Sequence, residues 1–110
     1  MEIYFATSRL KKLCESSSKL RQAHGATCAS RIAQRLSDMR AAEHLGEFRA
    51  LPGRCHALTG ERAGQVALHL PDGKRLVFEP AGEPAGQEEV EVLVWENVTA
   101  VRVLEIVDYH

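Results

Sequence analysis

Apolar residues occur along the chain in two patterns: short runs typical of strands, and three- and four-residue steps typical of helices. The order of these patterns predicts the order of the secondary-structure elements. The first apolar run, residues 3–5, is short and rich in residues that favour strands. Thr7 or Ser8 follows it and offers a hydroxyl oxygen that can accept a hydrogen bond from a free N–H group at a helix start. The sequence therefore predicts a strand that leads directly into a helix.

Two amphipathic helices are expected next. Apolar residues recur at three- and four-residue steps through residues 10–20 and again through residues 29–39, which is the spacing of one helix face. Gly25 is expected to end the first helix, which we expect to be loosened at residues 16–18, and the second should cover residues 26–42. Two helices joined by a short link form a hairpin whose apolar side must be covered, and we expect a sheet to cover it.

Strand patterns return in the second half of the chain. The predicted strands are residues 55–58, 65–70, 74–78 and 101–107, with an optional strand at 90–95. Residues 60–64 and the Pro71-Asp72-Gly73 sequence read as turns, and residues 81–89 as an exposed loop. The predicted fold class is α+β: an N-terminal strand and a helical hairpin packed on a mainly antiparallel, curled sheet of four to five strands.

Composition is that of an ordinary globular protein. The 110 residues suffice for one domain, spanning 1–110, and 45% are hydrophobic and 26% charged. No apolar run approaches the roughly 20 residues of a membrane span, and no signal-peptide pattern opens the chain. We therefore expect a cytoplasmic protein that has no membrane partner.

No cofactor or metal is expected. Cys14, Cys28 and Cys55 lack the spacing of a zinc site or a disulfide framework, and are interpreted as reduced, small hydrophobic residues. Glycine-rich nucleotide-binding motifs and the HExxH motif are absent from the sequence.

Charge is distributed unevenly along the chain, although the net charge is only −1. Residues 1–62 carry eleven Lys and Arg against six Asp and Glu, whereas residues 63–110 carry three against nine. A basic half of this kind can hold a phosphate backbone, or its cations can simply be the solvated faces of helices.

The last predicted strand ends in Asp108, Tyr109 and His110, which bring a carboxylate, a phenol and an imidazole. In a strand, residues two apart share a face, so we expect Asp108 and His110 to point the same way, together with Arg102, Leu104 and Ile106. Such a cluster on a rigid strand suits proton transfer. A merely solvated polar end of the chain is the alternative.

Further polar residues lie on or beside the predicted strands. The residues expected to converge on one face of the curled sheet are Arg54, His56, Arg75 and His110. Metal-free cleavage of RNA needs a base for the 2′-hydroxyl, cations for the charged phosphorane and an acid for the leaving 5′-oxygen. Imidazoles can be the base or the acid near neutral pH, and guanidinium groups match phosphate oxygens.

The other three histidines are interpreted as structural. His24 and His44 stand near helix ends, where we expect them to be C-cap partners. His69 lies on a predicted strand and is read as a surface residue or a filled core position.

Three segments in order resemble one protein family. The sequences LTGERAGQ at 58–65, KRLVF at 74–78 and VDYH at 107–110 are similar to the HigB or "killer protein" branch of the RelE/ParE toxins of bacterial toxin-antitoxin systems. The resemblance covers nearly the whole chain, except residues 81–96, and implies a RelE-like fold. It implies a ribosome-dependent mRNA endonuclease (an mRNA interferase) that inhibits translation, neutralised by a HigA-like antitoxin of helix-turn-helix type.

The resemblance also implies site residues. The proton-handling candidates are His56, Asp108, Tyr109 and His110. The RNA- or phosphate-binding candidates are Arg54, Arg62, Lys74 and Arg75. Two positions depart from the family pattern, because Thr59 replaces a common basic residue and Lys74 a common aromatic one.

Two readings without catalysis stay open from the sequence. One is a binding protein of the same fold, such as a gyrase inhibitor of the ParE type, which would use the helical hairpin and last strand as docking surfaces. The other is a catalytically silent partner that binds an antitoxin.

Overall fold

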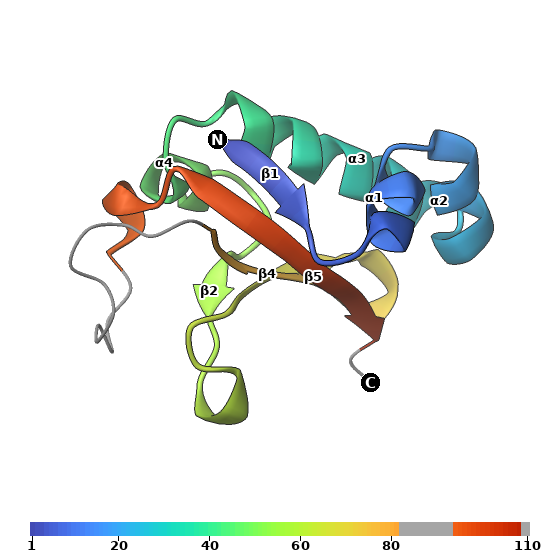
Figure 1. Ribbon diagram of the computed structural model, residues 1–110. Coiled ribbons are helices and arrows are strands. Elements are labelled where there is room, and N and C mark those ends of the chain that lie inside the picture. The colour runs from blue at the N-terminus through green and yellow to red at the C-terminus, as the bar shows by residue number, and fades with distance from the viewer. Residues whose placement is uncertain (82–93, 109–110) are drawn as a thin grey trace.

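A computed structural model describes residues 1–81 and 94–108 (Figure 1). Its helices are α1 (Ser8–Cys14), α2 (Ser17–His24), α3 (Ala26–Ala41) and α4 (Leu45–Arg49). Its strands are β1 (Glu2–Phe5), β2 (His56–Ala57), β3 (Val66–Leu70), β4 (Lys74–Pro80) and β5 (Ala100–Asp108). Short 3₁₀ turns cover Gly60–Arg62, Pro71–Gly73 and Trp95–Asn97.

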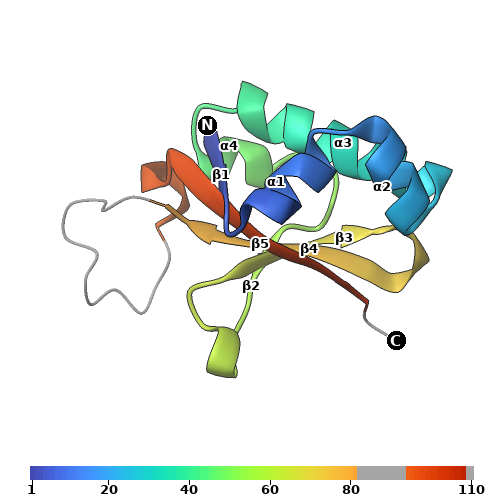
Figure 2. The same ribbon diagram turned by 45° about the vertical axis from the view of Figure 1, so that its right-hand side comes forward.

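The five strands form one mixed sheet in the order β1-β5-β4-β3-β2. The first strand runs parallel to β5, and the other neighbours are antiparallel. Figure 2 shows the four helices on the same side of this sheet, while the segment around β2 projects on the other side. The predicted α+β class, with a helical layer on a mainly antiparallel sheet, is confirmed.

The first predicted helix is divided in two. Ser16 interrupts it, and its hydroxyl oxygen accepts a hydrogen bond from the backbone N–H of Lys19 at 3.2 Å, which caps α2. We expected a loosened helix at residues 16–18. The structure has a complete break instead, at residues 15–16, between Cys14 and Ser17. Gly25 ends α2 as predicted, with a φ of +82° that favours glycine.

One expectation about a helix end is wrong, and one helix was not expected. Helix α4 was not predicted, and His44 caps its start rather than the end of another helix, since its Nδ1 accepts a hydrogen bond from the Glu47 N–H at 3.1 Å. The optional strand at 90–95 lies mostly outside the described residues, and its described end begins the 3₁₀ turn Trp95–Asn97.

The core lies between α3 and the helix-facing side of the sheet. Ile32, Leu36 and Met39 line the buried side of α3. They belong to the same buried cluster as Leu76 and Phe78 of β4. Alternate strand residues therefore face either this core or the opposite, helix-free face of the sheet, which we call the open face.

A bulge changes the register between β4 and β5. Val77 pairs with Glu105, but Phe78 pairs with Val103, so Leu104 has no partner on β4. Because of this extra residue, Arg102 lies on the open face opposite Glu79, to which it forms an ion pair of 3.1 Å. The expectation that Arg102 shares a face with Asp108 is wrong.

The described residues form no helix long and apolar enough to cross a membrane.

Truncation of the α3 stripe tests this core. Leu36 is 1% exposed, so Leu36→Ala should lower the free energy of unfolding by about 2–5 kcal/mol. Leu51 is 40% exposed, and the same truncation there should cost about 0.5 kcal/mol or less. Urea denaturation of both variants measures the difference, and equal losses would contradict this placement of the core.

Candidate functional site

The open face carries two rows of side chains that run across the strands. In the first row, His56 is paired with Ala67, which is paired with Val77. In the second row, His69 is paired with Arg75, which is paired with Val107. Because directly paired residues point to the same face, the two histidines and Arg75 all lie on the open face.

The two histidines are diagonal neighbours on β2 and β3. Their ring centroids lie 5.5 Å apart, with an angle of 49° between the ring planes. Arg54 precedes β2 and Arg75 faces His69 across the β3–β4 pair, so two guanidinium groups flank the imidazoles. We call Arg54, His56, His69 and Arg75 the histidine cluster.

The electrostatics of the cluster favour a neutral imidazole at His69. Desolvation lowers the pKa of His69 most, and the positive charge of Arg75 is the next cause. The charges of His56 and Arg54 lower the pKa further. An excess of positive charge of this kind attracts anions and disfavours an additional proton.

The segment before β2 holds His56 in place. Gly53 has a φ of +131° and accepts a hydrogen bond from the backbone N–H of His69 at 2.7 Å. Arg54 also has a positive φ, of 52°, and its carbonyl oxygen lies 2.9 Å from Nδ1 of His56. Two left-handed residues therefore turn the chain from the helical layer towards the open face.

This carbonyl contact assigns the tautomer of neutral His56. A carbonyl oxygen can only accept a hydrogen bond, so Nδ1 must carry the hydrogen. The other ring nitrogen, Nε2, then has a free lone pair in the neutral ring. His56 is thus held in the form in which Nε2 can accept a proton from a substrate.

The structure brings together part of the set expected from the sequence. Arg54, His56 and Arg75 share the open face, as expected. Tyr109 and His110, the other two candidates for proton transfer near the end of the sequence, lie outside the described residues.

His69 was missed, because the sequence reading treated it as a surface or core position. The turn Pro71-Asp72-Gly73 held the signal that could have found it. A hairpin closed over this turn places His69 opposite Arg75, beside the strand that carries His56.

Asp108 and Lys74 lie on the helix-facing side of the sheet instead. They are paired with each other, and Lys74 donates a hydrogen bond from Nζ to Nδ1 of His24 at 3.0 Å. Desolvation lowers the pKa of His24, Lys74 lowers it further, and Asp108 opposes this shift. Asp108 and Lys74, which the resemblance implies as site residues, are therefore not part of the histidine cluster. Strand alternation places them on the opposite side of the sheet from His56.

Arg62 is already engaged by other side chains. Its Nη1 donates a hydrogen bond to Gln65 at 2.9 Å, and its Nη2 forms an ion pair of 3.1 Å with Glu105. Both members of the ion pair are partly exposed, so the pair can open at small cost when an anion approaches.

The three cysteines are free, and their thiols are protonated at neutral pH. Burial raises the pKa of Cys14 to about 11 and that of Cys55 to about 12, and it also raises the pKa of Cys28. Within residues 1–81 and 94–108, no group of three His, Cys, Asp or Glu side chains could hold a metal ion.

Comparison with known proteins identifies the fold. A YoeB/ParE toxin from Agrobacterium tumefaciens superposes with a TM-score of 0.60 over 100% of this chain and 99% of that chain, at 15% sequence identity. No family model and no curated protein matches the sequence. The RelE/ParE-like fold implied by the resemblance is confirmed, whereas assignment to the HigB branch stays a prediction.

The contacts of His24 predict opposite effects of two substitutions on its pKa. Lys74→Met removes a positive charge and should raise the pKa of His24, whereas Asp108→Asn removes a negative charge and should lower it further. Titration of the imidazole protons by NMR measures both shifts. Shifts in the same direction would show that these side chains do not surround His24 as described.

The same pKa makes stability depend on pH. In the unfolded chain His24 binds a proton near its usual pKa of 6.5, while the folded protein resists that proton. Stability should therefore fall as the pH drops below about 6.5, down to the lower folded-state pKa. His24→Gln should reduce this loss in thermal melts between pH 7.5 and 5, and an unchanged pH dependence would contradict the assignment.

Proposed function

We propose that this protein is the toxin of a toxin-antitoxin system and cleaves mRNA by acid/base chemistry without a metal. The observation that carries the proposal is His56, which lies beside His69 in the histidine cluster and whose Nδ1 contact with the Arg54 carbonyl leaves Nε2 available for a proton. The toxin fold shared with the YoeB/ParE protein supports the biological setting. The sequence resemblance supports the choice of RNA as substrate.

The proposed reaction is an internal transesterification. His56 Nε2 takes the proton of a ribose 2′-hydroxyl, and the 2′-oxygen forms a bond to the adjacent phosphorus. The bond from phosphorus to the 5′-oxygen breaks, and a general acid donates a proton to that oxygen. The products are a 2′,3′-cyclic phosphate and a free 5′-hydroxyl group, and DNA is not cleaved because it lacks the 2′-hydroxyl.

The arginines of the histidine cluster bind the phosphate in this proposal. Arg75 and Arg54 stabilise the phosphorane, whose negative charge exceeds that of the starting phosphodiester. Desolvation and the surrounding cations lower the pKa of His69, so it stays neutral and orients the reacting group as a hydrogen-bond partner. The proposed general acid comes from Tyr109 or His110, which follow β5 in sequence.

The proposed partners follow from the resemblance. A HigA-like antitoxin of helix-turn-helix type would neutralise the protein, and mRNA on the ribosome would be its substrate in the cytoplasm. The gene beside this one should then encode such an antitoxin, and the two proteins should co-purify after co-expression.

A second candidate function is protein binding without catalysis. An open groove of about 700 Å³ between α1 and α2 is lined by Arg9, Lys12 and Lys19, among other residues. Its cations fit an acidic protein segment, which a gyrase inhibitor or a silent antitoxin-binding protein could use. This candidate predicts that the histidine cluster can be removed without loss of toxicity.

Induction of the protein in a bacterium separates the two candidates. We expect growth arrest, with mRNAs cut inside codons and ending in 2′,3′-cyclic phosphates, as detected by primer extension and end-specific ligation. His56→Gln should lower cleavage roughly 10²- to 10⁴-fold, which is the contribution of a general base, with little change in Tm. Arg75→Ala should weaken both binding and rate.

Arg40→Ala is the matched control, because Arg40 is an exposed cation in the last turn of α3. It should leave cleavage unchanged. Arrest with intact mRNA and supercoiling-deficient DNA would instead support gyrase inhibition. A folded His56→Gln variant with full cleavage would reject His56 as the base.

A further inference from the structure

A pocket of about 350 Å³ lies beside the histidine cluster, at the edge of the sheet. Its walls come from α3, from the segment before β2 and from the end of β3. The lining residues are Arg31, Arg35, Pro52, Gly53, Arg54, His69, Leu70 and Pro71. Arg54 and His69 belong to both the pocket and the histidine cluster, so the two sites are continuous.

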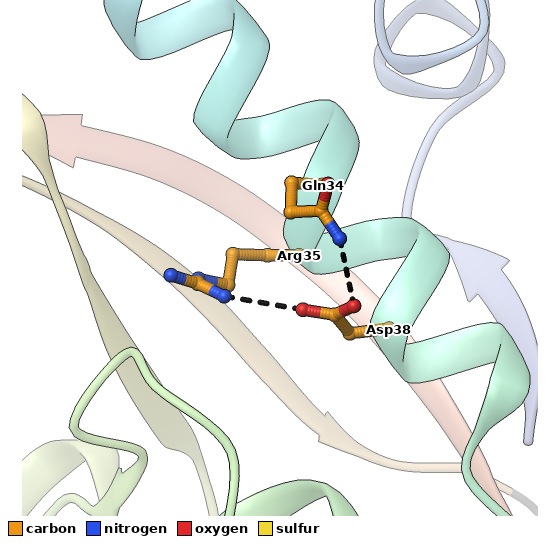
Figure 3. Close-up of polar contacts among 3 residues, drawn as sticks. All are labelled: Gln34, Arg35 and Asp38. Atoms are coloured by element: carbon orange, nitrogen blue, oxygen red, sulfur yellow. Dashed lines mark hydrogen bonds and ion pairs between the residues drawn. The ribbon is translucent and has the colours of Figure 1, made fainter.

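Arg35 is the unusual member of this pocket. It is only 6% exposed and is the one buried charged residue in the described part of the chain. Figure 3 shows that Asp38 holds its guanidinium group from one side, with 3.1 Å between Arg35 Nη1 and Asp38 Oδ2. Gln34 donates a hydrogen bond to the other oxygen of the same carboxylate at 2.9 Å. This carboxylate is therefore fixed on both oxygens and locks the guanidinium plane.

One nitrogen of the guanidinium group is left without a partner. Nε of Arg35 is buried and makes no hydrogen bond with the described residues. A buried, charge-bearing N–H group without an acceptor is unfavourable, and native proteins seldom retain one. Nε and Nη2 form the edge with which arginine grips two oxygens of a phosphate or carboxylate.

The backbone of Gly53 closes the pocket over Arg35. A Cβ atom at Gly53 would lie 3.4 Å from Nε of Arg35, in van der Waals contact, so the backbone of Gly53 packs close beside this edge. Arg31 and Arg54 are exposed at the rim, and neither forms an ion pair with a carboxylate among residues 1–81 and 94–108. The pocket thus combines one buried guanidinium group, held by Asp38, with two exposed cations.

We propose that this pocket binds a backbone phosphate of the RNA, next to the phosphate that is cleaved at the histidine cluster. The inference rests on the proposed function, because it extends the same RNA path from the open face over the sheet edge onto α3. Arg35, which lines the pocket, would contact the phosphate, and Arg31 would close over it. Arg54 and His69, which belong to both sites, would fix the spacing between the two phosphates.

NMR and binding measurements on the full chain test this proposal. Inorganic phosphate, and then a single-stranded RNA with 2′-O-methyl groups that prevent cleavage, should shift the signals of the Gly53 amide and of Arg35 Nε–H. Arg31→Ala should weaken binding of this RNA and reduce the slope of log Kd against log salt by about 0.7, the value for one phosphate of a single strand. Arg40→Ala, on the same helix, should leave the slope unchanged.

Further variants separate charge from geometry and from folding. Arg31→Lys should restore the salt slope but not the full affinity, because lysine lacks the planar fork. Arg35→Met should abolish the phosphate-induced shift at Gly53 if it folds. If it does not fold, the Arg31 variants decide the outcome.

The two proposals fail in different ways. If the wild-type protein does not cleave RNA but phosphate and RNA shift Gly53 and Arg35, the cleavage proposal fails and the phosphate pocket stands. The pocket proposal is wrong if cleavage is normal but two results are negative. The first is that Arg31→Ala and Arg40→Ala bind RNA with the same affinity and salt slope. The second is that RNA does not shift the signals of the Gly53 amide and Arg35 Nε–H. If inorganic phosphate shifts the signals but RNA does not, the pocket is an anion site unrelated to RNA.

Discussion

The packing of α3 against one face of the sheet is the constraint on which the other features depend. Its stripe of buried residues leaves only one side of each strand for the core. The alternate strand positions are thereby forced onto the opposite face, where Ala67 and Val77 are buried but His69 is exposed. His56, His69 and Arg75 occupy such positions, so the same packing that stabilises the fold also assembles the histidine cluster.

Long periodic elements could be predicted from the sequence, whereas short or non-local features could not. The three- and four-residue spacing on α3 and the turn signal at Gly25 are local, and both matched the structure. The five-residue helix α4 is too short to show a period. The bulge at Leu104 leaves no trace in the sequence either, because an apolar residue there keeps the strand pattern intact.

The same distinction explains the outcome for the site. His56 and Arg54 were found from their position beside a short strand, because the curled sheet brings that strand next to β3. Arg75 was found in the same way, whereas His69 was missed, because its place opposite Arg75 depends on the register of the β3–β4 hairpin. Asp108 was grouped with Arg102, which lies on the other face because of the bulge between Val103 and Glu105. Arg35 was read as one more cation on a helix, yet Asp38 and Gly53 give it a distinct environment.

The pairing of β1 with β5 has a consequence for synthesis. Residues 2–5 lie beside residues 100–103, so the first strand has no sheet partner until β5 has been made. The central position of β5, between β1 and β4, means that a nascent chain lacking it cannot complete the layer under α3. Folding should therefore be late and cooperative, with the emerging chain held as helices and hairpins without a finished sheet. The folded sheet would then form only once β5 has been synthesised, after the helices and the β3–β4 hairpin that precede it.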